Sequence, residues 1–96
     1  MTGTLSEIEI DHLRRKLKFR AWHRGIKEMD LILGNFADVA LEGMLETELL
    51  EFSELIEVND RDLIKWFTGE SDTPVEWRTE LIEKIKRNQM FVAKIG

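Results

Sequence analysis

Apolar residues recur at intervals of three and four along most of this chain, a spacing typical of helices that bury one face. Charged residues fill most of the intervening positions, and glycine, proline and asparagine interrupt the pattern. The pattern predicts an all-α protein, a compact single-domain five-helix bundle. The five expected helices cover residues 7–23, 26–45, 46–57 and 59–69, and the last begins at residues 73–76.

The apolar face of each expected helix marks the core. The helix over residues 26–45 has the widest apolar face and is expected to be the central one. Trp66 lies beside Leu63 and Phe67 on a short apolar face and is assigned to the core. The other positions expected to face inward are Ile10, Leu13, Leu17, Ala21, Ile26, Met29, Leu31, Ile32, Leu33, Phe36, Ala37, Ala40, Leu41, Met44, Leu49, Phe52, Leu55, Ile56, Trp77, Leu81 and Ile85.

Turn-forming residues predict where the helices begin and end. Gly25 follows the basic last turn of the first helix, where a left-handed C-terminal cap is expected. Thr73 and Glu76 form a capping-box pair with Pro74 at the first helical position, which predicts the start of the fifth helix. Gly34 lies inside the second helix and predicts a weak point there.

The chain has the length of one domain, and no repeat or linker divides it. Residues 1–96 are therefore interpreted as a single helical domain with its core over residues 7–89. The tail over residues 90–96 is apolar but has neither a cap nor a clear period. It is expected to be flexible, and it either packs on the bundle or waits for a partner.

Composition and motifs argue against an enzyme, so no catalytic residue is assigned. Cysteine is absent, which excludes thiolate nucleophiles and zinc–thiolate sites. His12 and His23 lie about 16 Å apart along a helix, too far to share a metal, and no metal site is assigned. The chain shows no phosphate-binding loop, no signal peptide pattern and no apolar run of about 20 residues. It is expected to be cytoplasmic, without a membrane or nucleic-acid partner, and monomeric when free.

Charge is distributed unevenly along the chain, although the net charge is only −5. Residues 12–27 contain seven Lys and Arg and no acid, whereas residues 28–62 contain eleven Asp and Glu against Arg61 alone. One interpretation is a directed contact between the basic block and an acidic partner. The other is that the two blocks pair within the fold. Charge alone favours neither.

The most informative stretch runs from Trp22 to Asp30, at the joint between the first two helices. Gly25 lets another backbone or a ligand approach closely, and Arg24 offers a planar fork for a carboxylate or phosphate. The same residues also suit ordinary helix capping, with Glu28 as a first-turn acid or as an i,i+4 partner of Arg24. Both interpretations remain open from these residues alone.

This stretch resembles the SdhE-type FAD assembly factors, called succinate dehydrogenase assembly factor 2 in mitochondria. Residues 24–28, Arg-Gly-Ile-Lys-Glu, match the family's RGxxE motif, and residues 29–37 are similar to its continuation. A second block shares the family's acidic, leucine-rich signature and its tryptophan. That block comprises Phe52, Leu55, Ile56, Glu57, Asp60, Asp62, Leu63, Trp66 and Gly69.

The resemblance implies a non-enzymatic chaperone that binds the flavoprotein subunit of succinate dehydrogenase, and in some bacteria of fumarate reductase. Such a factor promotes covalent FAD attachment, a step regarded as autocatalytic in the client, and no stably bound cofactor is expected. It also implies that Arg24 pairs with an acidic or phosphate group of the client while Gly25 permits close approach. The expected partner-binding residues are Arg24, Gly25, Glu28, Asp30, Arg20, His23, Lys27 and Trp22, the last exposed at the interface.

The alternative function is a helical protein-interaction module with another partner. Such a module is either antitoxin-like or a nucleic-acid adaptor that uses the basic block and Trp22. The acidic pI near 5.0 argues against a nucleic-acid adaptor.

Overall fold

The computed structural model describes the backbone of residues 5–95 and the side chains of residues 5–89. Within these residues the chain forms five α-helices and two 3-10 turns, and it forms no strand, which confirms the all-α prediction. The elements in chain order are α1 (Glu7–Trp22), α2 (Lys27–Ala40), η1 (Leu41–Gly43), α3 (Glu46–Leu55), α4 (Asp60–Thr68), η2 (Val75–Trp77) and α5 (Glu80–Ile95).

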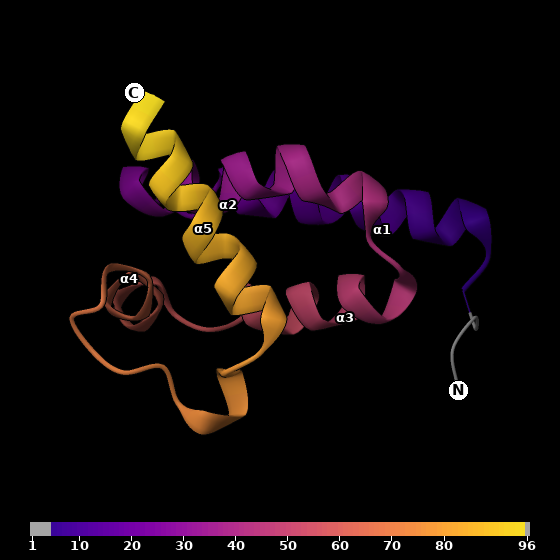
Figure 1. Ribbon diagram of the computed structural model, residues 1–96. Helices are drawn as coiled ribbons and strands as arrows, with labels where there is room; N and C mark the ends of the chain where they lie inside the picture. Colours follow the sequence, from indigo (N-terminus) through magenta and orange to yellow (C-terminus); the bar gives the residue numbers. More distant parts are fainter. Residues whose placement is uncertain (1–4, 96) are drawn as a thin grey trace.

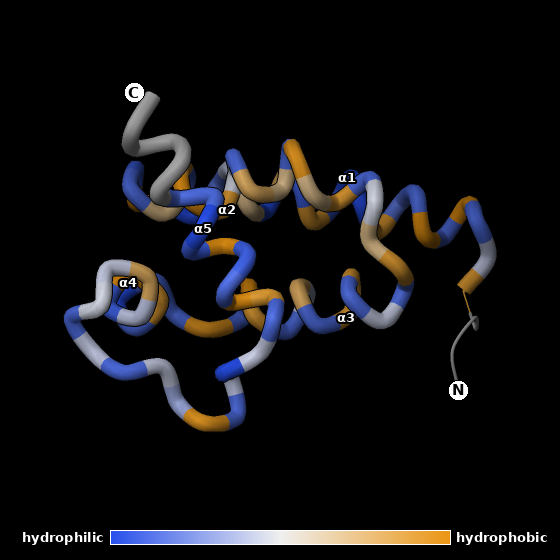
Figure 2. Tube along the Cα trace, in the orientation of Figure 1, coloured by the Kyte–Doolittle hydropathy of each residue, from blue (hydrophilic) through white to orange (hydrophobic). Residues whose placement is uncertain are grey.

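The helices pack around a pair formed by α1 and α2. These two lie side by side, α3 runs beneath them, and α5 crosses the pair (Figure 1). Helix α4 packs beside α2 and α5, and the loop that carries η2 runs from its end to the start of α5 (Figure 1). Apolar residues are interspersed with polar ones along the helices, as expected for helices that bury one face (Figure 2).

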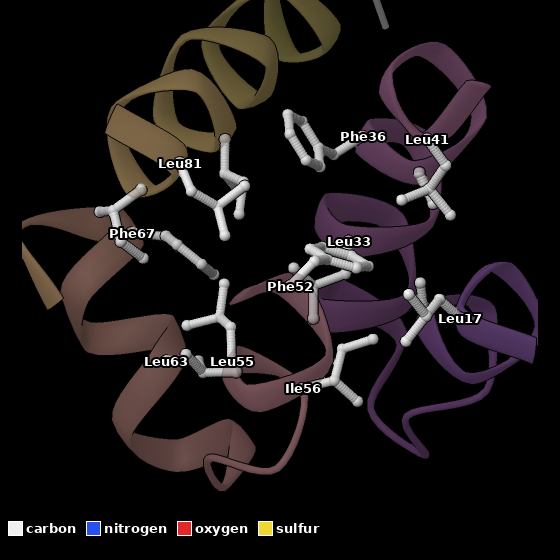
Figure 3. Packing of buried hydrophobic residues seen from close by; sticks show 14 of the residues in the cluster. Leu17, Leu33, Phe36, Leu41, Phe52, Leu55, Ile56, Leu63, Phe67 and Leu81 are labelled. Carbon is white, nitrogen blue, oxygen red and sulfur yellow. The ribbon is translucent and has the colours of Figure 1, made fainter. Parts of the chain in front are cut away.

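The core lies where all five helices meet, with Leu17 contributed by α1 (Figure 3). The rings of Phe36 and Phe52 stand 5.8 Å apart at a tilt of 41°, a favourable aromatic arrangement. Trp66 is buried, which confirms its assignment to the core. The buried apolar residues are Leu17, Ala21, Met29, Leu33, Phe36, Ala37, Leu41, Met44, Leu49, Phe52, Leu55, Ile56, Leu63, Trp66, Phe67, Leu81, Ile82 and Ile85.

Two helix boundaries differ from the prediction by more than two residues. Helix α2 ends at Ala40 rather than at Leu45, and a 3-10 turn follows. The Arg14 guanidinium accounts for this, because it donates to the carbonyls of Leu41 at 2.9 Å and Met44 at 3.0 Å. A side chain from α1 thus satisfies carbonyls that a longer α2 would have bonded itself.

The capping-box pair does not start the fifth helix. It leads only into the 3-10 turn η2, which contains Glu76, and α5 begins at Glu80. Thr73 is buried, its carbonyl accepts from Arg78 Nε at 2.8 Å, and its hydroxyl lies 3.4 Å from Lys86 Nζ. The Thr73 hydroxyl is therefore engaged by a lysine of α5 and does not cap a helix. The helix backbone continues to Ile95, whereas the tail's predicted packing or flexibility falls on side chains outside the described residues.

Two positions expected in the core are exposed. Ile26 is 42% exposed just before α2, and Leu31 is 44% exposed on the outer side of that helix. Their prediction was wrong because the apolar face of α2 is wider than the surface that its neighbours cover.

Trp22 packs against Gly34, which explains the glycine inside α2. A Cβ at Gly34 would lie 2.3 Å from the nearest atom of the Trp22 indole, far inside contact distance. The indole N–H donates to Asp38 at 3.1 Å, one turn farther along α2. The predicted exposure of Trp22 was therefore wrong, since the ring is half-buried on α2.

We expect Gly34→Ala to destabilise the protein although alanine is the better helix former. Overpacking against the indole costs about 1–3 kcal/mol, and the gain in helix propensity offsets about 1 kcal/mol of it. In a Trp22→Ala background, the effect of Gly34→Ala on the free energy of unfolding should have the opposite sign, so that the substitution stabilises the protein. Urea unfolding of the four proteins measures both effects.

Gly43→Ala is the matched control for this substitution, because a Cβ there would meet nothing within 4 Å. It should leave the free energy of unfolding nearly unchanged. Stabilisation by Gly34→Ala in the presence of Trp22 would refute the packing argument.

Candidate functional site

A four-residue loop, His23–Ile26, joins α1 to α2 and carries the first half of the motif. His23, Gly25, Ile26, Lys27 and Glu28 are exposed there. Arg24 and Asp30 are half-buried. The joint therefore presents an exposed segment from His23 to Glu28 that only Arg24 interrupts, and the side chains of Arg24 and Asp30 lie beneath it.

Gly25 adopts a backbone conformation that favours glycine. Its φ is +96°, and a Cβ there would meet no atom of the chain within 4 Å. The helix cap itself is His23, whose N–H donates to the Arg20 carbonyl at 3.3 Å. The predicted role of Gly25 as the cap was therefore wrong: Gly25 makes a left-handed turn two residues past the observed cap, and it leaves open space above the loop.

Arg24 ties the loop to the connection between α3 and α4. Its Nε donates to Asp60 Oδ1 at 2.8 Å, and its two terminal nitrogens donate to the carbonyls of Ile56 and Val58, the second at 2.9 Å. The two charged side chains are only 10% and 14% exposed. We call this arrangement, Arg24 with Asp60, Ile56 and Val58, the Arg24 clamp.

The backbone of the loop is held as well. The Arg24 N–H donates to Asp30 Oδ1 at 2.6 Å, so the carboxylate near the start of α2 secures the turn. Asp60 and Asp30, the two acidic partners of Arg24, therefore both fix the position of Arg24 within the fold.

The Arg24 clamp bears on two expectations. Each of the three side-chain nitrogens of Arg24 donates a hydrogen bond within the chain, so pairing with a client's acid would compete with these bonds, and it stays a prediction. Arg24 and Glu28 do not share a continuous helix, because α1 ends at Trp22 and α2 begins at Lys27. Sequence reasoning missed this partnership because Asp60 lies 36 residues farther along the chain.

The basic block pairs in part with the acidic block. Arg20 bonds Glu57, and Lys18 lies 3.4 Å from Asp38. The hydrogen bond from Arg20, helped by its charge, lowers the pKa of Glu57 below its ordinary value. Within residues 5–89, Arg15, Lys16 and Lys27 form no such ion pair, so the two blocks pair only in part, and the contact with an acidic partner stays a prediction.

Phe19 is an exposed aromatic residue that sequence reasoning did not single out. Its ring stacks on His23 with centroids 4.0 Å apart, and His23 Nδ1 lies 2.7 Å from the Phe19 carbonyl. Because a carbonyl only accepts, Nδ1 carries a proton, and in the neutral ring Nε2 is an acceptor. The sequence did contain a signal for Phe19, because this aromatic residue lies among lysines and arginines and outside the apolar face of its helix.

Glu28 lies at the edge of a groove with mostly apolar walls. The groove measures about 280 Å³ and lies between α2, α4 and α5. Glu28 forms no ion pair or hydrogen bond with the described side chains. Its carboxylate is therefore available to a partner. The lining residues are Glu28, Leu31, Ile32, Ile64, Thr68, Asn88 and Gln89.

Among the described residues, no group of three or more His, Cys, Asp or Glu side chains is placed to hold a metal ion. No helix in that part of the chain combines the length and the hydropathy needed to cross a bilayer.

Comparison with known families identifies the chain. A family model described as flavinator of succinate dehydrogenase matches residues 15–89. The chain belongs to this family. The match contains both sequence blocks of the resemblance, together with the Arg24 clamp and Phe19, and it confirms the resemblance to SdhE-type assembly factors.

Curated relatives of this flavinator family carry consistent names. Succinate dehydrogenase assembly factor 2 of Dictyostelium discoideum is 31% identical over 80 residues, which cover 83% of this chain and 57% of that protein. FAD assembly factor SdhE of Acetobacter pasteurianus is 35% identical over 72 residues, which cover 75% and 66% of the two chains. The mitochondrial assembly factor 2 of Schizosaccharomyces pombe is 32% identical over 74 residues, which cover 77% and 53%.

The chain thus spans between about half and two thirds of the length of these relatives. Their names are those of assembly factors and not of enzymes, in agreement with the prediction of a non-enzymatic protein. Mitochondrial and bacterial proteins are both among them, so the cytoplasmic location stays a prediction.

Proposed function

We propose that this member of the flavinator family binds the flavoprotein subunit of succinate dehydrogenase and promotes covalent FAD attachment to it. The binding surface is the exposed segment from His23 to Glu28. The chain itself performs no chemistry and retains no FAD. The observation that carries the proposal is the motif loop, in which Gly25 and Glu28 are exposed while buried contacts hold Arg24.

The loop is suited to recognition because its shape is fixed before binding. A preorganised loop loses little conformational entropy when a partner docks, so more of the contact energy appears as affinity. The Arg24 clamp and Asp30 supply this rigidity, and Gly25 leaves space for close approach. Arg24 and Asp30 are therefore positioning residues in this proposal, and Glu28, Lys27 and His23 are contact residues.

The alternative of a nucleic-acid adaptor has less support from the charges. Arg20, Arg24 and Lys18 are paired with acids of the same chain, so much of the basic block is neutralised. Proteins that bind phosphate backbones rely on several free cations on one face.

We expect the purified flavoprotein subunit to gain covalent flavin faster when this protein and FAD are added than with FAD alone. In-gel fluorescence of the denatured subunit measures the bond. Glu28→Gln should reduce the rate, because a contact carboxylate is lost without a change of shape.

Glu54→Gln, an exposed glutamate on α3 away from the loop, is the control and should act like the wild type. An equal flavin signal with and without this protein would refute the proposed function.

A further inference from the structure

The outer face of α1 carries an aromatic residue where a solvated helix would carry polar ones. Phe19 is 62% exposed. Arg15 and Lys16 precede it by four and three residues and His23 follows it by four, so all of them share one face of the helix. The stacked His23 ring extends the aromatic surface toward the motif loop.

This face is continuous with the proposed binding segment. A hollow of about 360 Å³ beside Phe19 and His23 reaches Asn59 and Asp60 at the start of α4. A second hollow, lined by Ile26, shares Asn59 and Asp60 with the first. Two exposed apolar side chains, Phe19 before the loop and Ile26 at its end, thus lie on either side of Gly25 in the chain.

The charges of this face indicate the chemistry of its partner. Arg15, Lys16 and Lys27 are exposed and form no ion pair within residues 5–89. Aromatic and arginine side chains are enriched in the cores of protein interfaces, and uncompensated charge steers an oppositely charged partner. A second copy of this chain is disfavoured as the occupant, because the same cations would then face one another.

We propose that Phe19, stacked on His23, is the apolar anchor of the flavoprotein interface, and that Arg15 and Lys16 attract an acidic segment of that client. This inference rests on the proposed function and specifies the partner chemistry at the same site. The client's segment presents one large apolar side chain to Phe19, with carboxylates around it.

The test is the equilibrium affinity of the full chain for the purified flavoprotein subunit, measured by biolayer interferometry at two salt concentrations. Phe19→Ala should weaken binding by about tenfold or more, as expected for an interface anchor. Ile8→Ala is the matched control, because Ile8 is 70% exposed on the same helix but far from the loop. Arg15→Glu combined with Lys16→Glu should weaken binding and reduce its salt dependence.

Thermal unfolding of each variant checks that the fold is retained, which is expected because Phe19 is largely exposed. Wild-type affinity for Phe19→Ala would overturn this inference and leave the proposed function intact. Absence of binding by the wild type would overturn both. Equal losses for Phe19→Ala and Ile8→Ala would also overturn it, since the effect would then not be specific to this face.

Discussion

Arg24→Ala should lower the free energy of unfolding by about 3–5 kcal/mol, a large fraction of the stability of a domain of this size. The loss is large because Asp60 would remain as a nearly buried carboxylate without a counter-charge. The carbonyls of Ile56 and Val58 would lose their charged donors as well. Urea unfolding followed by circular dichroism measures the change.

Arg20→Ala is the matched control, because Arg20 also pairs with an acid but the pair is exposed, at 35% and 66%. It should cost at most about 1 kcal/mol. Arg24→Met combined with Asp60→Leu should be less destabilised than Arg24→Ala, since no charge is left without a partner. If Arg24→Ala keeps wild-type stability but no longer binds the client, Arg24 is a direct contact of the client and not a positioning residue.

Replacement of Gly25 should abolish flavin attachment to the client while the helices remain folded. Any side chain at Gly25 is strained by about 1–2 kcal/mol, since φ is positive there. Gly25→Arg also projects a long side chain into the open space above the loop, where the proposed partner approaches. Covalent flavin on the succinate dehydrogenase flavoprotein, read by in-gel fluorescence in cells that lack the native gene, measures the effect.

A substitution at Gly69 is the control that distinguishes backbone strain from a loss of client recognition. Its φ is +82°, and a Cβ there also meets nothing within 4 Å, but it caps α4 away from the loop. Gly25→Ala and Gly69→Ala should therefore destabilise by similar amounts, and only Gly25→Ala should reduce the flavin signal. Equal flavin signals for the two variants would show that Gly25 is needed only for its backbone conformation and not for client recognition.

Taken together, the two experiments assign separate roles to adjacent motif residues. Arg24 fixes the loop from beneath, and Gly25 and Glu28 face outward. An alanine scan that measures only flavin attachment would show a loss for positioning residues and contact residues alike. Stability and flavin attachment must therefore be measured on the same variants.

The sequence by itself determined the helices, most of the core and the family. Helical periodicity is a local property, so the apolar repeat located all five helices. The sequence left the cap of α4 open between Asn59 and Asp60, and in the structure the Asn59 side chain accepts from the Asp62 N–H. The burial of Trp66 followed from its neighbours on one short helix. The two motif blocks led to the family through resemblance, before any geometry was known.

Only the tertiary structure decided which residues of the site face outward. The partner of Arg24 lies 36 residues away, and the glycine that receives Trp22 lies on another helix, so no local pattern relates them. Likewise, Thr73 lost its expected capping role to side chains that reach it from Arg78 and Lys86. Local spacing predicts which groups a helix offers, but the distances between helices determine which of those groups are already used within the fold.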